Sequence, residues 1–289
     1  MSPFLEEVPM FRTLSVLLVI VSGLVCSIEV VAQAGRQAKD VATFDEQIED
    51  LLSRLTLEEK VGQMNMPTMN SREMGRDIDE KRAASRSFAE GSYVEGLGPA
   101  GGFFGLANNA LPDGALQQAK FFNELQGIAV GKSRMKIPLL QIDEGTHGLM
   151  CPGGTIFPEG PALGSTWNLE LIEKVYAATA REARALGIHL LNTLVVEPNR
   201  DPRLGRNIEG YSEDTYMCAL IAETIVRAMQ GTDISTEDKV VASLCHFPGQ
   251  SEPVGGLERG AMEMSRRVLL ETFLPPWIAG LKEAGGLSL

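Results

Sequence analysis

The spacing of apolar residues along the chain predicts a buried sheet covered by helices. Three short, nearly continuous apolar runs are typical of strands that are buried on both faces: 138–142, 190–196 and 240–244. Segments in which apolar residues recur every three or four positions separate these runs, as in amphipathic helices. Strands that alternate with helices favour a parallel sheet, so the predicted fold class is α/β.

The ends of the predicted helices are marked by residues with a clear physical role. Asn168 and Gly187 are expected to bound one helix, because an asparagine side chain accepts free N–H groups and glycine tolerates a left-handed backbone. Ser212 and Gly231 are expected to bound the next, with acidic residues in its first turn. The final pattern predicts a helix over 265–274, an interruption at Pro275-Pro276 and a resumed helix over 277–284.

Other segments carry more local signals. Residues 45–64 are expected to be helical, with a restart at Thr56, where Thr56 and Glu59 have the spacing of a capping box. Residues 69–91 are polar and lack a clear period, which predicts a loop. The glycines between 96 and 105 predict a close passage of backbone near the core or a ligand.

The first 34 residues have the features of a secretory signal peptide. An apolar run from Leu14 to Val25 follows Arg12, and Ala32-Gln33-Ala34 provides a small-x-small cleavage site. We therefore predict a signal peptide over 1–34, a flexible lead-in over 35–44, and a secreted or periplasmic protein. The apolar run is shorter than a stable membrane span of about 20 residues. An anchor that stays uncleaved is the alternative.

Composition narrows the classes of partner. The formal net charge of −12 disfavours binding to nucleic acid or to anionic lipid, whereas an uncharged sugar is compatible with it. Of the four cysteines, three follow the predicted cleavage site, and they are too scattered for a disulfide framework. No CxxC or HExxH spacing occurs, so we predict no metal and no cofactor. The oligomeric state is left open.

Charged and hydrogen-bonding side chains follow each predicted strand. In a (β/α)8 barrel the functional residues lie at the carboxyl ends of the strands, where carboxylate, guanidinium and imidazole groups can bind sugar hydroxyls. The candidates are Asp143, Glu144, His147, Glu197, Asp201, Arg203, Arg206, Glu209, Asp214, Cys245 and His246. A doubly wound sheet is the alternative fold, but no G-x-G-x-x-G follows a strand.

Several candidates have a structural interpretation. Asp201, Arg203 and Asp214 are expected to brace a loop through ion pairs, and His147 to form a structural hydrogen bond at a turn. We treat these four, together with Asp143 and Glu209, as supporting residues. The two tryptophans, Trp167 and Trp277, could be platforms for a sugar ring, but burial on helix faces is the expectation.

Longer motifs resemble glycoside hydrolase family 3. They are IPLLQIDEGTHG (137–148), FPEGPALGSTWN (157–168), NRDPRLGRNIEGYSED (199–214), CHFPGQ (245–250) and SRRVLLETFLPPW (265–277). The resemblance extends from about Ile48 to the last residue. It places Glu144, Arg206 and His246 at sugar-binding positions of the family. Cys245 stands where the family has a lysine, and a thiol is a single weak donor where an ammonium group offers three.

The resemblance implies a fold and an activity. It implies a (β/α)8 TIM-type barrel that is incomplete, with about six strands, in a partial N-terminal domain over 45–289. The implied activity is hydrolysis of β-linked glucosides or oligosaccharides by a retaining mechanism that uses two carboxyl groups. It also implies that the nucleophilic aspartate and the acid/base lie beyond Leu289, so no catalytic residue is expected here. The alternatives are an inactive carbohydrate-binding remnant, β-xylosidase-type specificity, or an unrelated complete barrel.

Overall fold

The structure is a computed structural model that describes residues 44–69, 72–110 and 114–289. The chain divides into two compact units, Met1–Thr56 and Leu57–Leu289. The first contains a helix over 44–54 among its described residues. The predicted signal peptide lies outside the described residues, as does the predicted lead-in up to residue 43. No helix in the described ranges combines the length and the apolar character that crossing a membrane requires.

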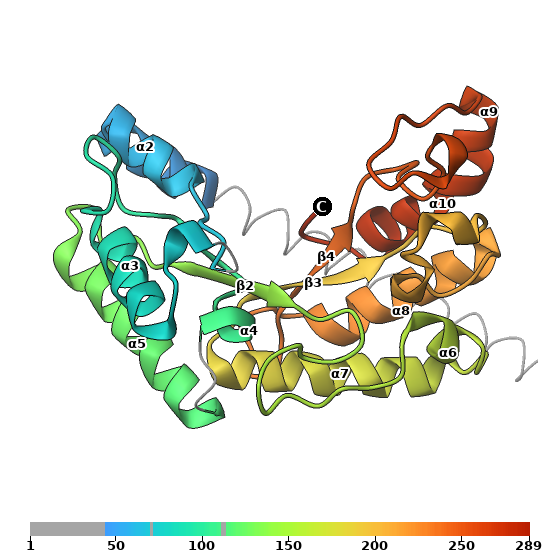
Figure 1. The fold of residues 1–289 in the computed structure, drawn as a ribbon, viewed down its shortest axis with the longest axis horizontal. Coiled ribbons are helices and arrows are strands. Elements are labelled where there is room, and N and C mark those ends of the chain that lie inside the picture. Colours follow the sequence, from blue (N-terminus) through green and yellow to red (C-terminus); the bar gives the residue numbers. More distant parts are fainter. Residues whose placement is uncertain (1–43, 70–71, 111–113) are drawn as a thin grey trace, which may run out of the picture. The chain divides into compact units, whose positions relative to one another are not determined.

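The second unit is built on a parallel sheet of four strands in the order β1-β2-β3-β4, as Figure 1 shows. The strands are β1 (Gly102–Phe104), β2 (Leu140–Glu144), β3 (Leu190–Val195) and β4 (Val241–Cys245). A single parallel bridge extends each edge, from Thr68 to Phe104 and from Ser243 to Ser288. The predicted α/β class is therefore confirmed, as an open sheet in which these bridges add to the four strands.

Helices connect and cover these strands. The α-helices of the second unit are α2 (Leu57–Met64), α3 (Ile78–Glu90), α4 (Leu106–Ala110), α5 (Ala115–Lys132), α6 (Gly160–Gly164), α7 (Leu169–Leu186), α8 (Thr215–Gln230), α9 (Arg266–Val268) and α10 (Leu274–Ile278). Four 3-10 turns are η1 (Arg72–Met74), η2 (Pro202–Leu204), η3 (Asn207–Glu209) and η4 (Val254–Gly256), and two π-helical segments are η5 (Leu269–Phe273) and η6 (Ala279–Glu283).

The core lies between the sheet and one layer of helices. Figure 1 shows α5, α7 and α8 along one face of the sheet, and their apolar residues join those of the strands in one buried cluster. Side chains alternate between the two faces of a strand. In β2, Gln141 and Asp143 are therefore buried on the helix side, while Ile142 and Glu144 on the other face are only half-buried. The second face of the sheet thus carries the accessible side chains.

Two glycines at the start of β1 show why the glycine-rich stretch passes so close to its neighbours. A Cβ on Gly101 would lie 2.0 Å from the Gln63 carbonyl oxygen, and one on Gly102 would lie 1.8 Å from that of Leu140. A residue with a side chain does not fit at either position, because its Cβ atom would overlap the carbonyl oxygen that it faces. The predicted close passage of backbone is confirmed.

Helix α3 contradicts the predicted loop over 69–91. Its buried side includes only Ala84, Ser85, Phe88 and Ala89, so small and polar residues cover the core and hide the apolar period. Asp77 caps its first turn by accepting the Glu80 N–H, and Gly91 ends it in a left-handed conformation. The capping residues Asp77 and Gly91 mark the ends of this helix in the sequence, although the spacing of its apolar residues does not reveal it.

Two further predictions about helix ends are wrong. Helix α8 is capped by Asp214, whose Oδ1 accepts the Met217 N–H at 2.7 Å, and not by Ser212. The helical run from Arg266 to Glu283 also continues through Pro275-Pro276. A π-helical segment precedes the prolines, and in this segment the Leu274 N–H donates five residues back to the Leu269 carbonyl. This wider turn lets the helix accept prolines that lack an N–H group.

The two tryptophans differ in environment. Trp277 is buried on α10, as predicted. Trp167 is 74% exposed and has a positive φ of 52°, directly before the Asn168 that caps α7. The prediction of burial is therefore wrong for Trp167, because the residue lies in the turn before the helix and not on its face.

Candidate functional site

Glu144 ends strand β2 on the accessible face of the sheet. It lies opposite Asn192 of β3 in the register, and the Asn192 side chain lowers the pKa of its carboxyl group. Burial raises the pKa of Glu144 to about 7, and the negative charges of Asp143 and Glu209 act in the same direction. The Arg206 guanidinium lowers this pKa. Glu144, Glu209 and Arg206 are thus close enough to influence one another.

Arg206 lies between η2 and η3, in the loop that follows β3, and is held by two carboxylates. Its Nε and Nη2 donate to the two oxygens of Glu209 at 2.9 and 2.7 Å, and Nη1 donates to Glu258 Oε1 at 3.0 Å. Nη2 also donates to His246 Nε2 at 3.1 Å. These bonds use four of the five guanidinium N–H groups and leave one on Nη1. Arg206 therefore joins three loops and keeps one free donor.

His246 follows the last residue of β4, to which a cis peptide bond joins it. Because Arg206 can only donate, the Nε2 atom of His246 accepts and the proton of the neutral ring lies on Nδ1. This Nδ1 donates to Gln250 Oε1 at 3.3 Å. Both ring nitrogens are thereby engaged, which fixes the orientation of the exposed imidazole.

Cys245 ends β4 and contributes a thiol in place of a charged group. Burial raises the pKa of Cys245 to about 12, and the carboxylates of Glu144 and Glu209 raise it as well. Its Sγ lies 3.9 Å from the Ser243 carbonyl oxygen. The thiol therefore stays neutral and offers neither a cation nor a nucleophilic thiolate to this part of the site.

Asp143 supports the site from the helix side of the sheet. Its Oδ2 accepts the backbone N–H groups of Ala107 at 2.8 Å and Asn108 at 3.4 Å, and its Oδ1 accepts that of Glu144 at 3.0 Å. Burial raises the pKa of Asp143 to about 6, although these hydrogen bonds oppose the shift. Asp143 thus fixes the start of α4 and the backbone of the neighbouring Glu144.

The remaining predicted residues have structural contacts. Asp201 forms a local ion pair with Arg203, with 2.6 Å between Oδ2 and Nη2, and Arg203 lowers the pKa of Asp201. Asp214 is the cap of α8 and not part of an ion pair. The Nδ1 of His147 lies 2.8 Å from the Phe157 carbonyl oxygen, as expected for a structural hydrogen bond. The structure therefore brings Glu144, Arg206, Glu209, Cys245 and His246 together and leaves these four residues in the surrounding segments.

Two contributors were not anticipated, and a third, Glu197, was a candidate without an assigned role. Asn192 lies opposite Glu144 in the register, Glu258 binds Arg206, and Glu197 accepts hydrogen bonds from the loop that carries His246. Only Glu197 had a signal in the sequence, because it is an acidic residue directly after a buried strand. The other two are recognisable only from their spatial partners.

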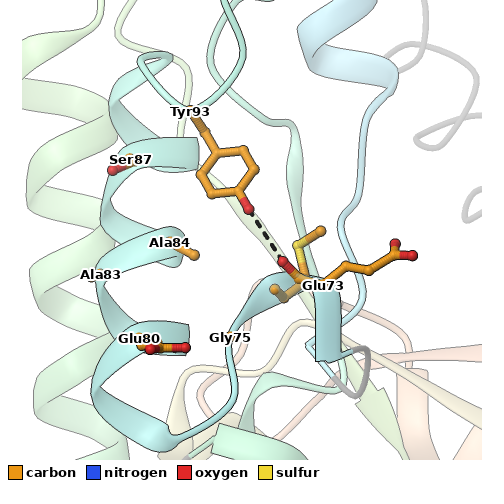
Figure 2. Close-up of a pocket in the computed structure, with 8 residues that line it drawn as sticks. Glu73, Gly75, Glu80, Ala83, Ala84, Ser87 and Tyr93 are labelled. Atoms are coloured by element: carbon orange, nitrogen blue, oxygen red, sulfur yellow. Dashed lines mark hydrogen bonds between the residues drawn. The ribbon is translucent and has the colours of Figure 1, made fainter.

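A separate hollow of about 390 Å³ lies beside α3 and η1. In Figure 2 the Tyr93 ring spans this hollow and its hydroxyl donates to the Glu73 carbonyl oxygen at 3.4 Å, while the Glu73 carboxylate points away. None of the predicted site residues lines it. Within the described ranges, no group of three or more His, Cys, Asp or Glu side chains is arranged to hold a metal ion. The predicted site residues that lie together are therefore found at and after the carboxyl ends of β2, β3 and β4, and not in this hollow.

A family model and two curated proteins match most of the length of this chain. Residues 56–288 match the family model described as glycosyl hydrolase family 3 N terminal domain. The chain is 30% identical over 239 residues to a periplasmic β-glucosidase of Salmonella typhimurium, covering 83% of this chain and 28% of that protein. It is 28% identical over 249 residues to a putative β-xylosidase of Formosa agariphila, covering 86% and 32%.

Solved structures share the fold. A β-glucosidase from Erythrobacter marinus superposes with a TM-score of 0.68 at 27% identity, covering 81% of this chain and 30% of that one. A Listeria innocua β-glucosidase in complex with glucose superposes with a TM-score of 0.70 at 25% identity, covering 84% and 32%. The chain thus spans about a third of the length of the proteins that it matches.

Proposed function

This chain belongs to glycosyl hydrolase family 3 through its N-terminal domain, and on that premise we propose that its strand ends bind one pyranose ring of a β-linked glucoside. The observation that carries the proposal is the contact between Arg206 and His246, within electrostatic reach of Glu144. Three different strands or their loops supply these side chains. They combine carboxylate acceptors, guanidinium donors and an imidazole, which together suit a ring of hydroxyl groups.

The proposed roles follow from the hydrogen bonds that each group has left. The half-buried Glu144 has carboxyl oxygens whose lone pairs can accept from sugar hydroxyls. Arg206 retains one Nη1 donor, and His246 has an exposed ring held in a fixed orientation. Cys245 supplies a neutral, weakly polar wall. Asp143, Glu209, His147, Asp201, Arg203 and Asp214 hold these groups in place.

We further propose that the whole enzyme hydrolyses the glycosidic bond by a retaining mechanism. This mechanism needs a nucleophilic carboxylate and an acid/base about 5–5.5 Å apart. Glu209 and Glu258 are both paired with Arg206, and Asp143 accepts three N–H groups, so these carboxylates are committed to structure. The proposal therefore assigns binding to residues 45–289 and the two catalytic groups to residues beyond Leu289.

Binding of free glucose to the 289-residue protein tests the sugar assignment. Calorimetry should detect glucose binding to the wild type and its loss in Arg206→Ala. Arg267→Ala is a matched control, because Arg267 forms an exposed ion pair with Glu271 on a helix. Equal loss in both variants, or no binding to the wild type, would contradict the proposal. Release of nitrophenol from an aryl β-glucoside by this chain alone would contradict the assignment of the catalytic groups.

β-Xylosidase-type specificity is the second candidate. A β-xylosidase of Formosa agariphila is 37% identical over 174 residues, covering 56% of this chain and 24% of that protein. Xylose lacks the hydroxymethyl group of glucose, so direct competition between the two sugars distinguishes the candidates. Tighter binding of xylose than of glucose would favour the second.

We also propose that the protein is secreted or periplasmic. The support is the apolar run and cleavage pattern within residues 1–34, together with similarity to a protein named as periplasmic. Sequencing the N-terminus of the protein recovered from its natural source tests this. A mature chain that starts near Gly35 is the expected result, and an intact Met1 would contradict it.

A further inference from the structure

Glu197 is a carboxylate buried without a cationic partner among its recorded contacts. It follows β3 by two positions and is 1% exposed. A buried charge is costly unless other groups hydrogen-bond to it. Four donors do so here: the Gly249 N–H and the Trp277 indole at Oε1, and the Ser251 N–H and hydroxyl at Oε2. The indole bond measures 3.2 Å, and the two bonds from Ser251 measure 3.0 and 2.8 Å.

Three of these four donors come from the loop that carries His246, and the fourth, the Trp277 indole, comes from α10. The N–H groups of Gly249 and Ser251 lie on either side of Gln250, so Glu197 fixes the backbone on both sides of that residue. Gln250 in turn accepts the Nδ1 proton of His246, whose Nε2 accepts from Arg206. A continuous chain of hydrogen bonds and backbone therefore runs from the buried carboxylate to the exposed imidazole.

Local backbone contacts and a contact of the Ser251 hydroxyl with the Pro198 carbonyl oxygen at 3.4 Å also shape this loop. Gly249 has a φ of +100°, a conformation that side chains rarely adopt, and a Cβ there would lie 2.7 Å from the Met262 side chain. The Gln250 N–H donates to the Phe247 carbonyl oxygen at 3.1 Å and closes a tight turn. The Glu252 N–H donates to the Gly249 carbonyl oxygen at 3.2 Å and closes a second turn, and Glu197 binds the backbone that lies between the two turns.

We propose that Glu197 is a positioning residue that sets the His246 imidazole for sugar binding. This proposal rests on the function proposed above and adds a residue that touches no sugar itself. Only a carboxylate satisfies the four donors, because each of its oxygens accepts two hydrogen bonds. A glutamine would accept at one oxygen and direct its amide hydrogens at two donors on the other side. The loop then has to move, and Gln250 and His246 move with it.

Histidine-selective NMR tests the proposal directly, since the chain contains three histidines. In Glu197→Gln the ring signals of His246 should shift, while those of His147 and His189 stay in place. Ser251→Ala removes one hydroxyl donor and Trp277→Phe removes the indole donor, and each should shift the His246 signals by a smaller amount in the same direction. These two variants keep the test decisive if Glu197→Gln does not fold.

A matched control separates positioning from general loss of stability. Thr179→Ala removes a buried hydroxyl that donates to the Val175 carbonyl within α7, away from the loop. It should leave the His246 signals unchanged. Signals of His246 that stay at wild-type positions in folded Glu197→Gln, or in both donor variants, would overturn the proposal, and so would an equal shift in Thr179→Ala.

Glucose titration distinguishes this failure from failure of the proposed function. We expect about tenfold weaker glucose binding in Glu197→Gln, corresponding to the loss of one well-placed hydrogen-bonding group. His246 signals that shift without any glucose binding to the wild type would support the positioning role and refute the sugar assignment. Unchanged glucose affinity together with unshifted His246 signals would overturn the positioning role alone.

Discussion

The substitution Glu144→Gln measures how much the ionised carboxylate at the end of β2 lowers the free energy of unfolding. Burial raises the pKa of Glu144 from 4.5 to about 7, with Asp143 and Glu209 adding to the shift. One pKa unit corresponds to about 1.4 kcal/mol, so the difference between the two values amounts to at most about 3.5 kcal/mol. The side chain is only half-buried, and solvent screening reduces the expected effect to about 1–2 kcal/mol. Glutamine retains the size of the side chain and a carbonyl oxygen that can accept hydrogen bonds.

The sign of the effect follows from proton binding. The folded protein holds the Glu144 proton between about pH 4.5 and about pH 7, whereas the unfolded chain has released it. The free energy of unfolding of the wild type therefore contains a contribution that is full below pH 4.5 and is lost as the pH rises through about 7. Glu144→Gln lacks this contribution at every pH. Its stability relative to the wild type should rise by about 1–2 kcal/mol between these limits.

Urea denaturation of both proteins at a series of pH values measures this difference. The shared contribution of other groups cancels when the wild-type value is subtracted at each pH. Glu170→Gln serves as the control, because the Lys174 ion pair lowers the pKa of Glu170 and predicts no gain at neutral pH. A difference between Glu144→Gln and the wild type that stays constant, or that falls as the pH rises, would refute the reasoning.

Three further substitutions probe the same site. Cys245→Lys should lower the pKa of Glu144 below about 7, because it places a positive charge where a neutral thiol now stands, and carboxyl-carbon NMR titration measures the shift. Glu258→Gln should lower the free energy of unfolding by less than about 1 kcal/mol in urea denaturation, because its ion pair with Arg206 is partly exposed; a loss above 2 kcal/mol would contradict this. Asp143→Asn should cost about 2–3 kcal/mol, because an amide cannot accept N–H groups on both sides, and faster amide hydrogen exchange in α4 should accompany the loss.

Much of the sheet and its covering helices could be predicted from the sequence because the signals are local. The run that becomes β3 is mostly apolar, and α7 begins after Asn168 and ends before Gly187 as expected. Glu144, Arg206 and His246 could be selected because the carboxyl ends of parallel strands meet at one edge of the sheet.

The rest depends on contacts between distant segments. Glu258 meets Arg206 across 52 positions of sequence, and Glu197 meets Gly249 across the same separation. Nothing within a window of neighbouring residues specifies either partner. Helix α3 was missed for another reason, since alanines and a serine form most of its buried side and give little apolar contrast with its charged side.

The order of the strands in space is also their order along the chain. Each strand therefore pairs with the one made just before it, and the sheet can grow in one direction as the polypeptide leaves the ribosome. The segment after β2 is synthesised first and the segment after β4 last, so Glu144 leaves the ribosome before His246. Each pairing closes a loop that contains at least one helix, as between Gly102 and Leu140 or between Leu190 and Val241, so each new strand has to wait for its crossover segment. The edge of the sheet where Glu144, Arg206 and His246 lie is thus complete only when the segment after β4 has been synthesised.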